Sequence, residues 1–245
     1  MSKKYKAVIL VGGTGGHVFP GCNLAKHLIE MNYNVDLVSD KRGYKYLEKY
    51  KDLKITILPS KPFLNKNLIH LFFSSIFICY SILRSLIFLI VNRPTIIFGM
   101  GGYASFPMSI AASFLKIKLI IYENNLILGK ANKYLVSSAN KIMVSSKALE
   151  GIPKKHQYKI IEIGNIINKE IINFSKKNFK RDNRKLNILI LGGSQAAKIF
   201  AETLPQIFKK CLENGINVKI YQHCLKSQNE KLKIFYEKNK IDYDI

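Results

Sequence analysis

Four glycines and a histidine near the start of the chain are the residues best suited to chemistry. Gly12, Gly13, Gly15 and Gly16 follow a short apolar, β-branched run and precede His17 and an apolar helical pattern. This order predicts a strand, a tight loop and a helix. Glycines let a ligand approach the main chain, and the helix offers unpaired N–H groups and the positive end of its dipole. The loop therefore predicts a phosphate site, with His17 as the side chain that can accept a proton near neutral pH.

The first glycine loop is less specific than a complete nucleotide-binding signature. Val18 stands where a dinucleotide fingerprint has glycine or alanine, and no Gly-Lys-Ser/Thr follows for a nucleotide triphosphatase. A NAD-type site and a purely structural glycine turn are the alternative interpretations of the loop alone. For His17 the alternative is a histidine that caps a helix or packs in the core.

Three later stretches place similar groups after apolar runs. Gly101 and Gly102 follow one such run, and a further glycine pair precedes Ser194. Glu123, with two asparagines directly after it, follows another run. A carboxylate and two amides at the end of a strand suit a polyhydroxylated ligand, although a solvated loop acid is the alternative for Glu123. Loops at the carboxyl ends of neighbouring parallel strands would together form a crevice.

The apolar pattern as a whole predicts an α/β fold. Strands are expected at 34–39, 55–58, 119–122, 141–145 and 159–163, and a helix at 106–115. This alternation implies right-handed crossovers and a parallel sheet. Asp40 lies where a NAD enzyme places its ribose-binding acid, and we interpret it as a solvated turn residue. The polar, basic stretch 175–185 is the expected linker between an N-terminal domain at 1–174 and a partial second domain at 186–245.

Residues 68–91 form the most apolar stretch and, at ~1.5 Å per residue, are long enough to cross a bilayer as a helix. Five polar residues project onto one stripe on that helix: His70, Ser74, Ser81, Arg84 and Ser85. Such a stripe favours a helix that lies in the membrane interface, where Lys61, Lys66 and Arg93 would meet lipid phosphates. A buried helix and a true membrane span are the alternatives.

The composition limits the class of protein. Of the 245 residues, 48% are hydrophobic, which is ample for a packed core. The formal charge of +23 suits nucleic acid, an anionic membrane surface or phosphorylated ligands, or reflects compositional drift. Four scattered cysteines predict a reduced compartment and no structural zinc. The basic start precedes an apolar run too short for a signal peptide, which predicts a cytoplasmic protein.

Taken together, the three glycine motifs and the turn at Glu123 resemble the MurG family, in order from residue 6 to about 240. The resemblance implies inverting transfer of N-acetylglucosamine from UDP-N-acetylglucosamine to undecaprenyl-diphosphate-linked muramyl peptide, without a cofactor. It also implies a GT-B fold of two Rossmann-like, doubly wound domains, the second incomplete here. The resemblance implies that the first domain binds the acceptor and an anionic membrane surface. It further implies a peripheral protein on the cytoplasmic face of the inner membrane. No nucleic-acid partner is expected.

The resemblance also implies roles for single residues. His17 and Glu123 stand at the positions of the candidate base and its polar partner. The implied substrate contacts are Thr14, Gly15, Gly16, Gly101, Gly102, Tyr103, Asn125, Asn168 and Ser194. Asn168 replaces an arginine of the family and cannot supply its charge or its bidentate hydrogen bonds. Ala196 replaces a glycine, which is a milder change.

The family's later segment, which holds uridine and sugar, is absent from this sequence. We therefore expect either a truncated or split enzyme or a chain whose missing half comes from another polypeptide. Asp242-Tyr243-Asp244 resembles the metal-binding Asp-x-Asp of other transferases, but no metal is expected there. The alternatives are a diacylglycerol glycosyltransferase, a membrane-docking acceptor-binding subunit or inactive remnant, and a NAD-dependent dehydrogenase.

Overall fold

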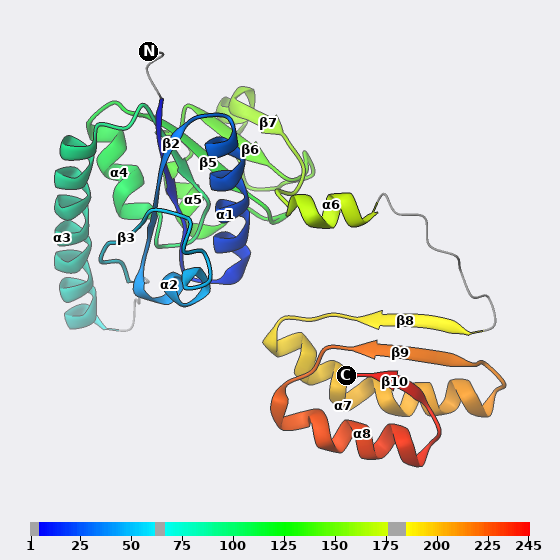
Figure 1. The fold of residues 1–245 in the computed structure, drawn as a ribbon. Coiled ribbons are helices and arrows are strands. Elements are labelled where there is room, and N and C mark those ends of the chain that lie inside the picture. The colour runs from blue at the N-terminus through cyan, green and yellow to red at the C-terminus, as the bar shows by residue number, and fades with distance from the viewer. Residues whose placement is uncertain (1–4, 62–66, 176–184) are drawn as a thin grey trace. The chain divides into compact units, whose positions relative to one another are not determined.

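The computed structural model describes residues 5–61, 67–175 and 185–245 (Figure 1). The side chains at 68, 69 and 194–196 are outside the described set. The chain forms two compact units, Met1–Lys176 and Lys177–Ile245, and each is described by itself. The expected linker at 175–185 lies almost wholly outside the described residues.

The first unit is built on a parallel sheet of seven strands in the order β3-β2-β1-β4-β5-β6-β7. The strands are β1 Lys6–Leu10, β2 Asn34–Ser39, β3 Ile55–Ile57, β4 Ile96–Gly99, β5 Lys118–Glu123, β6 Lys141–Val144 and β7 Ile160–Glu162. Every neighbouring pair is parallel, so the predicted α/β fold is confirmed. The chain runs outward from β1 to β3 on one side and from β4 to β7 on the other. The switch point of this doubly wound sheet is therefore between β1 and β4.

Helices cover both faces of this sheet (Figure 1). The helices of this unit are α1 Gly15–Glu30, α2 Lys41–Leu47, α3 Leu68–Asn92, α4 Phe106–Phe114, α5 Lys130–Leu135 and α6 Lys169–Ser175, with a 3₁₀ helix at Lys154–Lys159; α6 has no buried residue. Side chains alternate along β1, as the pleat requires. Ala7 and Ile9 join one core with α1 and α2, whereas Val8 and Leu10 join the other with α3, α4 and α5. Both faces of β1 are buried, which explains its continuous apolar sequence.

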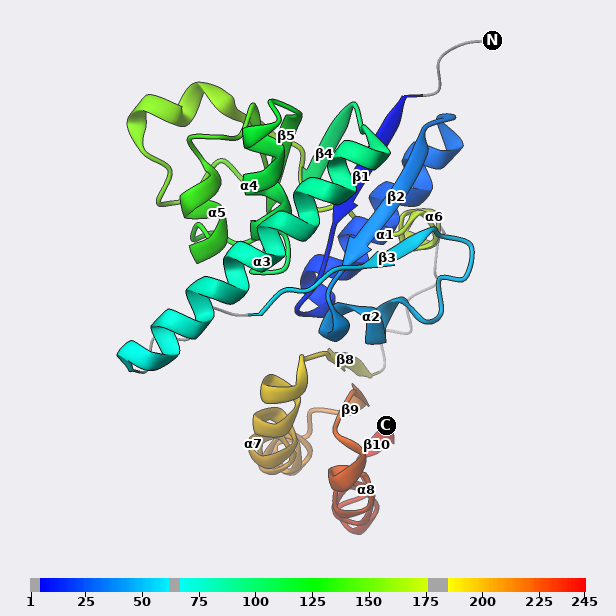
Figure 2. The same ribbon diagram turned by 90° about the vertical axis from the view of Figure 1, so that its left-hand side faces the viewer.

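Helix α3 packs along α4 (Figure 2). Two of its serines face the protein, and most of its large apolar side chains face away from it. Ser81, Ser85 and Leu89 are buried, and both serine hydroxyls donate to the carbonyl four residues earlier at 2.8 Å. Arg84, at one edge of the predicted polar stripe, is exposed, whereas Ser81 and Ser85 of the same stripe face the protein. The α3 apolar face, which is exposed, consists of Phe72, Phe73, Ile76, Tyr80, Leu83, Ile87, Ile90 and Val91.

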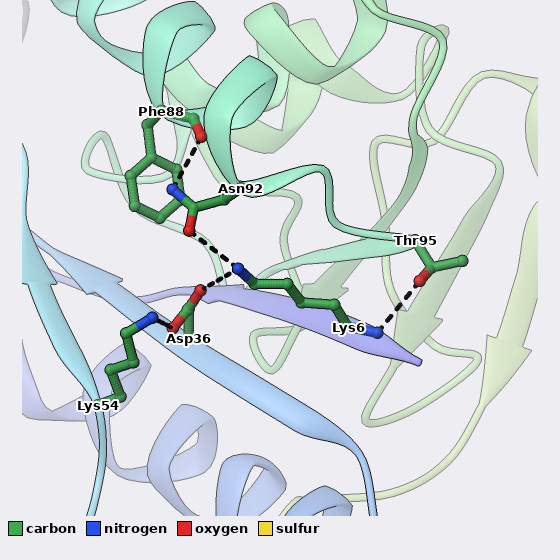
Figure 3. Close-up of polar contacts among 6 residues, drawn as sticks. All are labelled: Lys6, Asp36, Lys54, Phe88, Asn92 and Thr95. Carbon is green, nitrogen blue, oxygen red and sulfur yellow. Dashed lines mark hydrogen bonds and ion pairs between the residues drawn. The ribbon is translucent and has the colours of Figure 1, made fainter. Parts of the chain in front are cut away.

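A buried carboxylate ties the C-terminal end of α3 to the sheet (Figure 3). Asp36 on β2 is fully buried and forms ion pairs with Lys6 at 3.0 Å and Lys54 at 2.6 Å. The Lys6 ammonium also donates to Asn92 Oδ1 at 2.9 Å, and Asn92 Nδ2 donates to the Phe88 carbonyl at 3.0 Å. Burial opposes ionisation of Asp36, but the two lysines outweigh it and hold the pKa of this carboxyl below its usual value.

The second unit contains three parallel strands in the order β10-β9-β8. Its elements are β8 Leu186–Ile190, α7 Ser194–Glu213, β9 Val218–Gln222, a 3₁₀ turn at Lys226–Gln228, α8 Asn229–Lys238 and β10 Asp242–Asp244. The core joins Ile190 and Ile220 to Phe208 of α7 and Tyr236 of α8. The predicted strand, glycine turn and helix after residue 185 are therefore confirmed.

Candidate active site

The two glycine loops of the first unit meet at the switch point of the sheet. In the register of β1 and β4, Leu10 pairs with Gly99, and the Met100 amide donates to the Leu10 carbonyl at 3.0 Å. Both loops therefore leave the same edge of adjacent strands. Ligands of open parallel sheets bind at the carboxyl ends of the strands beside such a switch point.

The first loop presents main-chain donors at the start of α1. Thr14 is the N-cap of α1, and its side chain makes no capping hydrogen bond. The amides of His17 and Val18 donate to the Thr14 carbonyl at 3.1 and 3.2 Å. Within the described ranges, the N–H groups of Gly15 and Gly16 have no partner, as is usual for the first turn of a helix. These two donors and the helix dipole suit an anion.

His17 connects the first loop to the second. Its Nδ1 lies 2.9 Å from the carbonyl oxygen of Met100. Gly101 and Gly102 have φ of +94° and +74°, and a Cβ atom on either would stand 3.0 or 3.1 Å from the His17 ring. Glycine is thus required twice, by backbone conformation and by the close approach of the imidazole. A carbonyl only accepts, so Nδ1 carries the hydrogen and Nε2 retains its lone pair.

Asp40 is buried, with 3% of its surface exposed, which corrects the prediction of a solvated turn residue. Its Oδ1 accepts from the amides of Gly43 at 2.8 Å and Gly13 at 3.1 Å, and its Oδ2 accepts from the Tyr103 hydroxyl at 2.8 Å. Burial and this hydrogen bond raise the pKa of Tyr103 to about 12. A ribose-binding role of the NAD type is not needed to explain Asp40, since both carboxylate oxygens accept hydrogen bonds from the protein.

Glu123 is also buried, with 2% exposed, so the alternative of a solvated loop acid is wrong. Its Oε1 accepts from the amide and the side chain of Asn125 at 3.2 and 2.8 Å. Its Oε2 accepts from the Gly129 amide at 2.9 Å and from Asn132 Nδ2 at 3.0 Å. The carboxylate therefore shapes the turn that presents Asn125, which itself is exposed.

Asn124 links this turn to the first glycine loop. Pro20 lies inside α1 and has no N–H, so the carbonyl of Gly16 lacks its normal helical donor. Asn124 Nδ2 donates to that carbonyl at 3.3 Å. The three loops that follow β1, β4 and β5 are thus joined side by side at one edge of the sheet.

The remaining predicted residues lie elsewhere. Asn168 caps α6, because its Oδ1 accepts from the Glu170 amide at 2.9 Å. Ser194 begins α7 of the second unit, but its side chain is outside the described set. Asp242 pairs with Lys185 at 3.0 Å. Across the described ranges, no group of three or more His, Cys, Asp or Glu side chains has the geometry to hold a metal ion.

Sequence reasoning missed the structural roles of Asp40, Asn124 and Asn132. A signal for Asp40 was available, since an acidic residue directly before a helix is a typical N-cap. Pro20 also indicated that a carbonyl one turn earlier would need an outside donor, although nothing in the sequence identifies Asn124 as that donor. For Asn132 we find no signal.

This fold places the chain among proteins of the GT-B type. A crystal structure of MurG from Acinetobacter baumannii matches 98% of this chain and 65% of that structure, with a TM-score of 0.74 and 21% identity. A UDP-GlcNAc 2-epimerase from Neisseria meningitidis bound to UDP-GlcNAc matches 98% of this chain and 71% of that structure, with a TM-score of 0.61 and 15% identity. At these identities the likeness establishes the fold alone.

Sequence comparison establishes the family. The glycosyltransferase family 28 N-terminal domain matches residues 7–144. The UDP-N-acetylglucosamine--N-acetylmuramyl-(pentapeptide) pyrophosphoryl-undecaprenol N-acetylglucosamine transferase of Pelagibacter ubique is 34% identical over 98% of this chain and 66% of its own length. The same transferase of Rickettsia canadensis is 34% identical over 98% of this chain and 67% of its own length. The chain belongs to this family, the MurG transferases, and spans about two thirds of the length of these relatives.

Proposed function

We propose that this chain takes part in the transfer of N-acetylglucosamine from UDP-N-acetylglucosamine to the 4-hydroxyl of undecaprenyl-diphosphate-linked N-acetylmuramyl pentapeptide. The observation that carries the proposal is the position of His17, held between two glycine loops at the switch point of the sheet. The two substrates in this proposal are those that the names of the relatives state.

In the proposed reaction, His17 Nε2 takes the proton of the muramyl 4-hydroxyl. The freed oxygen attacks C1 of the sugar from the face opposite UDP, the bond from C1 to the diphosphate oxygen breaks, and UDP leaves with the electron pair. One base is enough because inversion needs no covalent sugar intermediate. The Nδ1–H group of His17 keeps its hydrogen bond to the Met100 carbonyl, and this bond holds the ring in one orientation during the reaction.

The substrates are assigned to the loops by the same chemistry. The free amides of Gly15 and Gly16 suit the acceptor diphosphate, and Thr14 and Asn125 would bind sugar hydroxyls, whereas the Tyr103 hydroxyl already donates to Asp40. Ser194 and the glycine pair before it suit the donor diphosphate in the second unit. Asn168 would contribute no charge, since its carbonyl oxygen already caps α6.

We further propose that the α3 apolar face docks on the cytoplasmic side of the inner membrane. By length and composition His70–Asn92 meets the requirement for a membrane-crossing helix, which core helices of soluble proteins also meet. Helix α3 packs on α4 with Ser81 and Ser85 buried, while its apolar side chains point outward, which supports lateral insertion in the interface. Lys61, stacked 4.7 Å from the Phe77 ring, would meet anionic headgroups, as would the exposed Arg93; Lys66 is outside the described residues.

A second candidate follows from the first unit itself, because its described groups at Gly15, Gly16 and His17 are all assigned to the acceptor. In this candidate the chain is an acceptor-binding, membrane-docked subunit, and transfer requires a separate polypeptide that supplies the donor site. The two candidates differ only in whether the chain turns over alone.

Transfer of label from UDP-N-acetylglucosamine tests both. The chain is incubated in detergent with the undecaprenyl-linked muramyl peptide, or with diacylglycerol, alone and with the remaining third of a relative added as a separate polypeptide. We expect a β-linked disaccharide product with the muramyl acceptor only. Product that appears only with the added polypeptide supports the second candidate, and product on diacylglycerol contradicts the proposed acceptor. Absence of product with every combination contradicts both candidates.

A further inference from the structure

Asp40 lies where three turns at the carboxyl edge of the sheet interlock. Gly12 and Gly43 approach so closely that a Cβ on Gly43 would stand 2.6 Å from the Gly12 Cα. A Cβ on Gly12 would stand 2.6 Å from Asp40 Oδ1 and 2.4 Å from the Ala104 Cβ. The turns that follow β1, β2 and β4 therefore share one tightly packed region with the Asp40 carboxylate inside it.

Capping of α2 explains only one of the three hydrogen bonds that the Asp40 carboxylate accepts. The bond from the Gly43 amide is an ordinary N-cap contact. The bonds from the Gly13 amide and the Tyr103 hydroxyl reach the first and the second glycine loops, across 27 and 63 residues of sequence. A group that served only as a cap would not need either of them.

We propose that Asp40 is a positioning residue that fixes the two glycine loops against each other and so holds His17 on the Met100 carbonyl. The mechanism is geometric. Gly13 belongs to the loop that leads to His17, and Tyr103 belongs to the loop that carries Met100. With both loops bonded to one buried carboxylate, the donor and the acceptor of the His17 hydrogen bond keep a fixed separation. The role of this alignment in catalysis rests on the proposed function, but the alignment itself does not.

The variant Tyr103→Phe separates capping from positioning. It removes the bond that Asp40 Oδ2 accepts and leaves the bonds from Gly43 and Gly13 to Oδ1 in place. Asp40→Ser tests the same link from the other side, because serine also caps helices but its single oxygen stands on a shorter side chain and replaces only one of the two carboxylate oxygens. Asparagine is not used, since its Nδ2 could donate to the Tyr103 oxygen and preserve the link.

The orientation of His17 is measured by nitrogen NMR on histidine-labelled protein, with His17→Ala for assignment. In the wild type we expect a single Nδ1–H tautomer at His17. Asp40→Ser and Tyr103→Phe should each convert it to a mixture of tautomers, and the double variant should resemble either single one. A wild-type His17 signal in a folded Tyr103→Phe protein would overturn the proposal. Should Tyr103→Phe fail to fold, a wild-type signal in Asp40→Ser overturns it equally.

Kinetics give the second readout. In the assay that supports transfer, each variant should lower kcat about tenfold, by ~1.4 kcal/mol of activation free energy, with KM for UDP-N-acetylglucosamine unchanged. A raised KM with unchanged kcat would contradict a positioning role. If no variant or wild type transfers sugar, the proposed function fails while the NMR result still decides the position of His17.

Discussion

His17 Nδ1 and the Met100 carbonyl oxygen lie 2.9 Å apart although 83 residues separate them in the sequence. The contact turns two separate glycine loops into one site, because it fixes the imidazole of the first loop on the backbone of the second. It also determines which nitrogen is available for chemistry, since only Nε2 retains a lone pair.

Removal of the imidazole should abolish transfer and spare the fold. We expect His17→Ala to lower kcat by about 10²–10⁴-fold, the usual contribution of a general base, while UDP-N-acetylglucosamine binding by calorimetry stays unchanged. His27→Ala, on the same helix and exposed to solvent, is the control and should retain wild-type kcat. Unchanged kcat in His17→Ala would exclude it as the base.

The second loop should tolerate no side chain at Gly102. Gly102 and Gly164 have φ of +74° and +76°, but a Cβ meets the His17 ring only at Gly102, and at Gly164 it meets nothing within 4 Å. Each alanine variant should lose about 1–2 kcal/mol of unfolding free energy from its backbone conformation. Only Gly102→Ala should also lose activity. Equal activity in the two variants, measured alongside urea unfolding, would show that contact with His17 is unimportant.

Glu123→Gln distinguishes a structural carboxylate from a catalytic one. Glutamine would place an NH₂ against donors that now point at Glu123, such as the Gly129 amide and Asn132 Nδ2. We expect about 1–3 kcal/mol lower unfolding free energy, because buried donors would be left unpaired. Thermal and urea unfolding measure this. Wild-type stability with lost activity would instead indicate a direct catalytic role.

Vesicle binding should depend on the α3 apolar face. Leu83 and Ile87 are 57% and 50% exposed, and their joint replacement by aspartate should weaken co-sedimentation with anionic vesicles at least tenfold, about 1.4 kcal/mol. Ile234→Asp on α8, at a residue 63% exposed, is the matched control. A similar loss in both proteins would argue against docking through α3.

The unfolding free energy of the first unit should fall at low pH because Asp36 becomes protonated. Its folded pKa lies below its unfolded value of about 3.9, so the stabilisation is complete above that pH and is lost as pH falls through the folded pKa. Asp36→Asn should be about 1–3 kcal/mol less stable at pH ~6, and the difference should shrink towards pH ~3.

Asp52→Asn is the control for that series, since Asp52 and Lys26 form an exposed pair at 3.5 Å and should contribute under about 1 kcal/mol. A stability difference between wild type and Asp36→Asn that stays constant with pH would contradict the account.

The sequence predicted the central strands well because their apolar runs are buried, and β1 and β4 are also followed closely by glycines. The glycine loops and His17 followed from the same signal. The surroundings of the site did not, because they depend on contacts between turns far apart in the chain, such as Asp40 with Tyr103 and Asn124 with Gly16. The helical periodicity of α3 placed its polar residues on one stripe, but it did not show whether that stripe faces the protein or the solvent. Serines that bond their own helix pack inward as readily as apolar side chains.

The central claim is that the loop at Gly15 and Gly16 binds the acceptor diphosphate beside His17. Titration of a soluble undecaprenyl-diphosphate muramyl-peptide analogue into labelled protein tests it by NMR. The account predicts that the amide signals of Gly15 and Gly16 and the Nε2 signal of His17 shift together with one dissociation constant. Binding that leaves these three signals in place while others move would contradict it.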